Sequence, residues 1–273
     1  MEIRLWYSFR ASVFSDLTGP GGIGVPDGFD DNGDVWTPID PNYQGLSGAG
    51  YAIMGPTNML SYPNIHEVTF FGTYRNGIQN HYIRLSANPL NENDDYNLVG
   101  NPYPSAIDAR TFIARNSANI SGILYYWTHC LPISASNPGT SAYNFATNDY
   151  AMFNLTGGTQ ASPNCGSIPT DYIAAGQGFF VEAQIADYLK FDNADRVGGF
   201  GRNSNFYRTT ENVQERNRLW LDFKHENGLF SQILIAYSPE TTNDYDWAYD
   251  GIVNEGGNSV GLYSFIGQEA YRI

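Results

Sequence analysis

The stretch Tyr96-Asn97-Leu98-Val99-Gly100-Asn101-Pro102-Tyr103-Pro104-Ser105-Ala106-Ile107-Asp108 decides how this chain is interpreted. Its first four residues are largely apolar and β-prone, which is typical of a strand. Pro102 and Pro104 follow, and each proline removes a backbone donor and disfavours the helical conformation in the residue before it. We therefore expect the chain to leave a sheet at this corner.

A short helix near residues 105–118 is predicted directly after the corner. Ser105 suits its N-cap because a serine hydroxyl can accept a backbone N–H of the first turn. Asp108 would lie in that first turn, and Phe112 and Ile113 would form part of the buried side.

The composition favours a β protein. Aromatic residues make up 15% of the chain and charged residues only 15%, with 29 Gly and 14 Pro, whereas ordinary domains carry about 25% charged residues. Short β-prone runs separated by turn residues recur along the whole chain. We predict a mainly β fold, an antiparallel β-sandwich or jelly-roll-like arrangement with one short helix.

Two β lobes are one possible organisation, with lobe 1 at residues 1–104 and lobe 2 at residues 105–273. A weak echo supports it, because Gly48-Ala49-Gly50-Tyr51 resembles Gly176-Gln177-Gly178-Phe179. A chance match and a single continuous domain are the alternative. Little sequence follows the last predicted strand, Gly261–Phe265, so we expect a truncated C-terminus.

The net charge of −14 argues against nucleic-acid partners and against docking on anionic lipid. We also expect no membrane insertion, because no run of about 18 apolar residues occurs, and the N-terminus does not resemble a signal peptide. Cys130 and Cys165 are the only two cysteines. The sequence leaves open whether they are bridged or are two buried thiols.

The Tyr96–Asp108 stretch and three further blocks resemble one family in the same order. These blocks are Ile173–Ala183, Arg218–Phe223 and Gln232–Tyr237 with the segment that follows. The family comprises modules of Bacteroidota surface and secreted proteins exported by the type IX system, of the kind that precede a C-terminal sorting domain. The resemblance implies an extracellular or cell-surface location, and it supplies no catalytic residues.

A calcium site is one candidate cofactor site. Asp30, Asn32 and Asp34 alternate around Gly33, so they could direct hard oxygens at one ion. The segment lacks the glutamate that closes an EF-hand loop, and a metal-free acidic turn is the simpler interpretation. Asn91–Asp95 and Asn243–Asp246 with Asp250 resemble it more weakly.

A carbohydrate site is the other candidate. Trp36, Tyr245 and Trp247 lie in polar surroundings and could stack on sugar rings, while Asp250 could accept hydrogen bonds from hydroxyls. Packing of the aromatic rings in a β core is the alternative.

Catalytic motifs give little support for an enzyme. Gly19–Gly24 has the spacing of a dinucleotide-binding loop, but Pro26 follows where a helix would have to begin. We therefore predict first a non-catalytic extracellular module, structural or adhesive, whose partners are polysaccharides or other surface proteins. A carbohydrate-binding module of an exported polysaccharide-degrading system is the alternative. A hydrolase with loop-borne carboxylates is the second alternative.

Overall fold

The computed structural model describes residues 6–19, 22–23, 30–40, 42–53, 71–87, 94–128, 132–137, 140–145, 149–162, 168–199, 203, 217–225, 230–252 and 261–273. Cys130 and Cys165 lie outside these residues, as do residues 91–93 of the weaker acidic candidate Asn91–Asp95. The fold is mainly β with one short α-helix, as predicted, and its paired strands are antiparallel.

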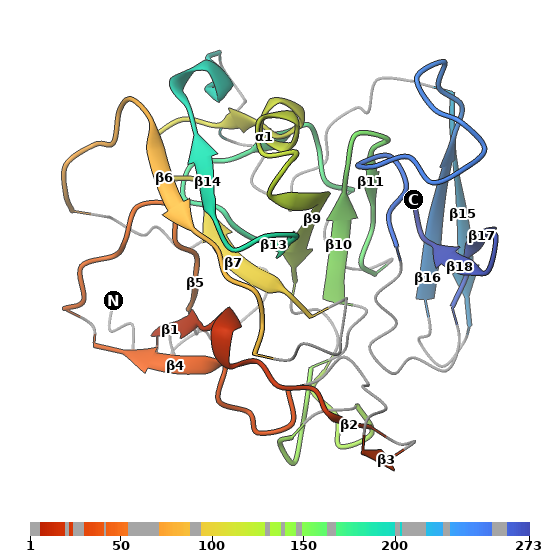
Figure 1. The fold of residues 1–273 in the computed structure, drawn as a ribbon, viewed down its shortest axis with the longest axis horizontal. Coiled ribbons are helices and arrows are strands. Elements are labelled where there is room, and N and C mark those ends of the chain that lie inside the picture. Colours follow the sequence, from red (N-terminus) through yellow and green to blue (C-terminus); the bar gives the residue numbers. More distant parts are fainter. Residues whose placement is uncertain are drawn as a thin grey trace.

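A five-stranded sheet forms the centre of the molecule (Figure 1). In spatial order its strands are β11 (Gly158–Thr159), β10 (Tyr150–Phe153), β9 (Ile120–Trp127), β13 (Gly178–Ala183) and β7 (Tyr96–Gly100).

Smaller sheets surround it. A three-stranded sheet has the order β4 (Trp36–Ile39), β1 (Trp6–Phe9) and β5 (Tyr51–Ile53). The two-stranded pairs are β8 (Ile107–Asp108) with β12 (Tyr172–Ile173), β6 (Gln79–Tyr82) with β14 (Tyr188–Phe191), β15 (Arg218–Lys224) with β16 (Phe230–Ala236), β17 (Ser264–Ile266) with β18 (Glu269–Tyr271), and β2 (Thr18–Gly19) with β3 (Gly22–Ile23). The helix α1 spans Ala109–Arg115, and two 3₁₀ turns, η1 and η3, span Ala11–Val13 and Asn193–Asp195.

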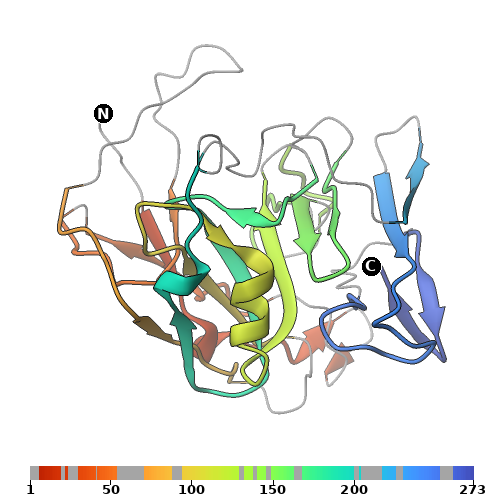
Figure 2. The same cartoon turned by 90° about the horizontal axis from the view of Figure 1, so that it is seen from above.

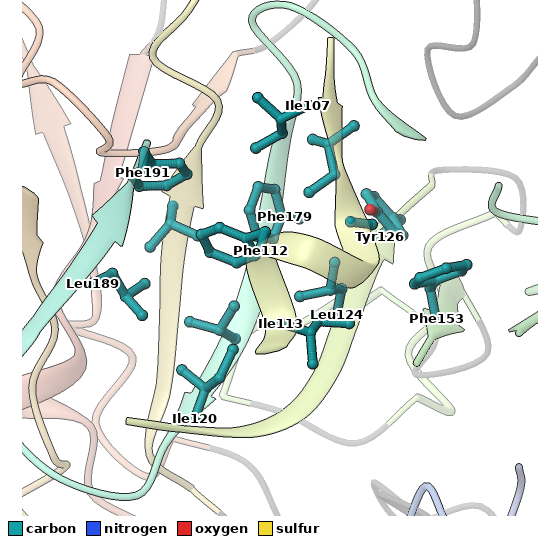
Figure 3. Packing of buried hydrophobic residues seen from close by; sticks show 14 of the residues in the cluster. Ile107, Phe112, Ile113, Ile120, Leu124, Tyr126, Phe153, Phe179, Leu189 and Phe191 are labelled. Atoms are coloured by element: carbon teal, nitrogen blue, oxygen red, sulfur yellow. The ribbon is translucent and has the colours of Figure 1, made fainter. Parts of the chain in front are cut away.

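One face of the central sheet carries the main core, which α1 covers (Figure 2). Phe112 of α1 stacks on Phe191 at 4.9 Å between ring centroids and meets Phe179 edge to face at 5.6 Å. Figure 3 shows these three rings close to one another. Burying each such side chain stabilises the fold by roughly 1.5–3 kcal/mol.

The opposite face carries a second core built from the alternate residues of the same strands. Ile123, Tyr125 and Phe180 pack there against Leu234 of β16 and the C-terminal Ile273. Because β9 and β13 are covered on both faces, their sequences are nearly continuous apolar runs.

The corner after β7 has the predicted form, and Asn101 holds it in place. Its amide nitrogen lies 2.9, 3.1 and 3.0 Å from the carbonyl oxygens of Ser105, Ile173 and Ala174. Its amide oxygen accepts a 3.0 Å hydrogen bond from the Tyr103 backbone N–H. One buried side chain therefore ties the corner to the segment before β13.

The helix begins later than predicted, so Ser105 as N-cap was wrong. Asp108 is the N-cap, and its carboxylate accepts a 2.8 Å hydrogen bond from the backbone N–H of Thr111. Ile107 and Asp108 pair with β12 as a short strand, which excludes them from the helix. The Ser105 hydroxyl instead accepts a 2.8 Å hydrogen bond from Arg196.

The two Gly-x-Gly segments lie on opposite edges of β7. The N–H of Gly50 donates to Leu98 at 3.1 Å on one edge, and Gly178 is in register with Gly100 on the other. A Cβ on Gly50 would lie 2.6 Å from the Val99 carbonyl oxygen, so this close approach requires glycine.

Strands from both sides of residue 104 share sheets. The strands β6 and β7 pair with β14 and β13, respectively. This pairing favours the single continuous domain over two separate lobes. Among the described residues, no helix is long and apolar enough to cross a membrane.

Candidate binding site

A pocket of about 480 Å³ opens where α1, the turn after β10 and the C-terminal hairpin β15–β16 meet. Its volume lies in the range of small-ligand sites. Its lining combines apolar residues of β16 with a set of hydrogen-bonding side chains: Arg110, Thr156, Arg218, Glu240, Tyr249 and Asp250.

Arg110 enters the pocket from the first turn of α1 and is held rigidly. Its Nε donates a 2.9 Å hydrogen bond to Asp171, and Nη1 donates to the carbonyl of Leu155. Its guanidinium carbon lies 5.7 Å from the centre of the Phe153 ring. The charge is therefore fixed in position before any ligand arrives.

Tyr249 and Glu240 form a second fixed group. The Tyr249 hydroxyl donates a 2.7 Å hydrogen bond to Glu240, and this bond together with burial raises the pKa of the tyrosine. The backbone carbonyl of Tyr249 accepts from Asn154 at 2.8 Å and from Thr156 at 2.7 Å. These bonds tie the segment around Tyr249, which follows β16, to the turn after β10.

Asp250 is the predicted ligand residue that the fold brings into this pocket. Its carboxylate accepts a 2.7 Å hydrogen bond from the backbone N–H of Asp246. Burial raises the pKa of Asp250, and the neighbouring Asp246 adds to that effect. Asp246 itself closes the loop by accepting from Thr242.

Tyr237 supplies an exposed ring to the lining, and sequence reasoning missed it. It is 78% exposed and directly follows β16. A large exposed aromatic side chain that directly follows a mostly buried strand indicates a binding surface. That signal appears only once the end of the strand is known.

The other predicted aromatic residues lie elsewhere. The Trp247 ring packs against the main core, and its Nε1 donates a 3.1 Å hydrogen bond to the carbonyl of Ile120. Trp36 of β4 meets Phe9 edge to face at 5.1 Å. Tyr245 lies 6.0 Å from the ring of Tyr271. Trp247 therefore belongs to the core, whereas Trp36 and Tyr245 are 37% and 44% exposed and lie outside the pocket lining.

The predicted calcium residues make hydrogen bonds within or next to their own loop. Asp30 accepts a 3.0 Å hydrogen bond from the backbone N–H of Ser15, and Asn32 accepts from that of Asp34 at 3.1 Å. The second bond is that of an Asx turn. In the part of the chain that the structure describes, no group of three or more His, Cys, Asp or Glu side chains is placed to hold a metal ion.

Glu182 is a further carboxylate that the sequence did not single out. It lies on β13 opposite Tyr96, on the face that carries the second core. Burial raises its pKa to about 7, and the nearby charges of Asp95 and Asp94 act in the same direction. This side chain is a charge held at a cost in stability.

These features define an antiparallel β protein with a preformed polar pocket at the junction of its central sheet and its C-terminal hairpin. The chain belongs to the family described as "Domain of unknown function (DUF8693)", whose model matches residues 29–273. No curated protein and no solved structure matches the chain.

Proposed function

We propose that this chain is a non-catalytic module of a bacterial surface or secreted protein and that it binds polysaccharide through the pocket. The observation that carries the proposal is the exposed ring of Tyr237 beside several fixed hydrogen-bonding groups. The proposal places the module outside the cell, as the family resemblance implies.

Sugar rings suit this lining. A pyranose presents a C–H face, which stacks on an aromatic ring, and a rim of hydroxyls, which need donors and acceptors. Tyr237 offers the ring, Glu240 and Asp250 offer acceptors, and Arg110 and Arg218 offer donors. Because Arg110 and Tyr249 are already held by protein contacts, little side-chain entropy is lost on binding.

A glycan array tests the proposal. We expect the native chain to retain a defined set of polysaccharides or oligosaccharides and Tyr237→Ala to lose the signal. Tyr74→Ala is the matched control, because Tyr74 is 82% exposed and does not line the pocket. Absence of any bound glycan, or equal binding by Tyr237→Ala, would contradict the proposal.

A hydrolase is the second candidate, and the raised pKa of Asp250 favours it. Glu240 and Asp250 both line the pocket, so one could act as acid and the other as base or nucleophile. Incubation of the native chain with a polysaccharide that it binds decides between the two functions. Binding without release of reducing ends supports the module, and release that Asp250→Asn abolishes supports the hydrolase.

A further inference from the structure

One guanidinium nitrogen in the wall of the pocket has no hydrogen-bond partner. Arg110 uses Nε to donate to Asp171 at 2.9 Å and Nη1 to donate to the carbonyl of Leu155. Its Nη2 is buried and has no hydrogen-bond partner in the part of the chain that the structure describes. Such a donor costs free energy unless a ligand or a water molecule supplies an acceptor.

The contacts of Arg110 fix the direction of this nitrogen. Two hydrogen bonds from different nitrogens hold the guanidinium plane, and the ring centre of Phe153 lies 5.7 Å from the guanidinium carbon. The side chain as a whole is 23% exposed, so the guanidinium is not sealed off from the pocket that it lines. A guanidinium fixed in this way binds a planar carboxylate with little loss of side-chain entropy.

Arg218 brings a second positive charge to the same pocket from the start of β15. Its guanidinium carbon would lie 3.0 Å from a Cβ added to Gly157 in the turn after β10. Leu155, which accepts from Arg110, belongs to the same turn. Two arginines from distant parts of the chain therefore flank residues 155–157, and their combined charge favours an anionic group nearby.

Acceptor groups line the pocket from the segment that follows β16. Glu240 accepts a 2.7 Å hydrogen bond from the Tyr249 hydroxyl, and Asp250 accepts one of 2.7 Å from the backbone N–H of Asp246. A carboxylate has about four acceptor positions, so both retain capacity for ligand hydroxyls. The pocket thus offers cationic donors beside the turn and acceptors on residues 238–250. A ligand with one anionic group and several hydroxyls matches both.

We propose, on the basis that the pocket is a polysaccharide site, that it selects a uronic acid residue and that Nη2 of Arg110 donates to the carboxylate of this sugar. A hydrogen bond between charged groups is about twice as strong as a neutral one. The C–H face of the sugar would then stack on Tyr237, and its hydroxyls would donate to Glu240 and Asp250. An ordered water molecule is the competing partner of Nη2, and it would give no preference for an acidic sugar.

Matched ligands test the selectivity by isothermal titration calorimetry. The ligands are oligogalacturonate, oligoglucuronate and oligoalginate, each with its carboxyl-reduced form, and a sulfated galactan that has no carboxylate. The native chain should bind at least one uronate at least about tenfold more tightly than the reduced form. Added salt should shrink this difference.

The outcomes separate the selectivity from the proposed function. Equal affinity for acidic and reduced forms, binding of none of the three uronates, or tighter binding of the sulfated galactan would overturn the uronate assignment. In each case a glycan retained on the array would leave the polysaccharide site standing. Absence of binding to any glycan would contradict the proposed function and the uronate assignment together.

Two variants and a control locate the carboxylate. Arg110→Lys keeps the positive charge but removes Nη2, so it should reduce the preference for the uronate to less than about threefold and leave the affinity for the reduced form nearly unchanged. Arg218→Gln should also lower the preference, and it serves as the second variant if Arg110→Lys does not fold. Arg84→Gln is the matched control, because Arg84 is exposed and does not line the pocket. An unchanged preference in both pocket variants would overturn the assignment.

Discussion

Asn101 is the residue on which the corner between β7 and α1 depends. It is 6% exposed, and its amide group contacts three carbonyl oxygens and one backbone N–H. Its backbone N–H also donates to Gln177 at 3.1 Å. The three carbonyl oxygens need a donor and the Tyr103 N–H needs an acceptor, so the side chain at this position must supply both.

Asn101→Ala should destabilise the protein by about 2–4 kcal/mol, because it leaves several buried backbone groups unpaired. Asn101→Asp should also destabilise it, since aspartate offers no donor to the three carbonyl oxygens. Urea denaturation followed by tryptophan fluorescence measures both effects. A loss below about 1 kcal/mol for the alanine variant would show that the corner does not depend on this amide.

At the residue scale the sequence predicted the corner but not its key residue. Pro102 and Pro104 act locally, so their effect on the backbone is visible in the sequence. Asn101 acts through Ile173 and Ala174, which lie more than seventy positions away. Pairing at that distance is invisible to local pattern.

At the element scale, α1 shows how sheet pairing competes with helix capping. Ser105 and Asp108 are both acceptable N-caps from sequence. Ile107 and Asp108 both pair with β12 as a short strand. The helix therefore begins only after Asp108. The Ser105 hydroxyl instead accepts a hydrogen bond from Nε of Arg196.

Asp108→Ala should therefore lower stability by about 1 kcal/mol through loss of the cap. Asp108→Asn should cost only a few tenths of a kcal/mol, because asparagine is an equally good N-cap. Comparison of the two urea midpoints measures the difference. Equal midpoints for the two variants would show that the carboxylate of Asp108 does not act as a cap.

At the scale of the whole molecule, buried carboxylates set the response to pH. Burial raises the pKa of Asp94 to about 6 and that of Glu182 to about 7, above their ordinary values. The stability associated with these groups is present at acidic pH and is lost as the pH rises through about 6 to 7. The native Tm should thus be higher at pH 5 than at pH 8.

Glu182→Gln should raise the free energy of unfolding at pH 8 by about 2 to 3 kcal/mol, because it removes the cost of ionising a buried group. At pH 4 the two proteins should differ much less. Urea denaturation at both pH values provides the measurement. A variant that is less stable than the native chain at pH 8 would contradict a raised pKa.

The fold class was predictable because composition and short β-prone runs are properties of the sequence itself. The pocket was much less predictable from the sequence. Of its lining, Asp250 was predicted, whereas Tyr237 and Arg110 reach it only through the packing of α1 and the C-terminal hairpin around the central sheet. Trp247 was predicted as a ligand residue, and the structure buries its ring against the main core.

The affinity of the pocket for an oligosaccharide tests the central claim most directly. Isothermal titration calorimetry with the strongest glycan from the array should give a Kd at least about tenfold weaker for Tyr237→Ala, since loss of one stacked ring costs on the order of 1.5 kcal/mol. Tyr74→Ala should bind like the native chain. Equal Kd values for native, Tyr237→Ala and Tyr74→Ala proteins would contradict a carbohydrate site in this pocket.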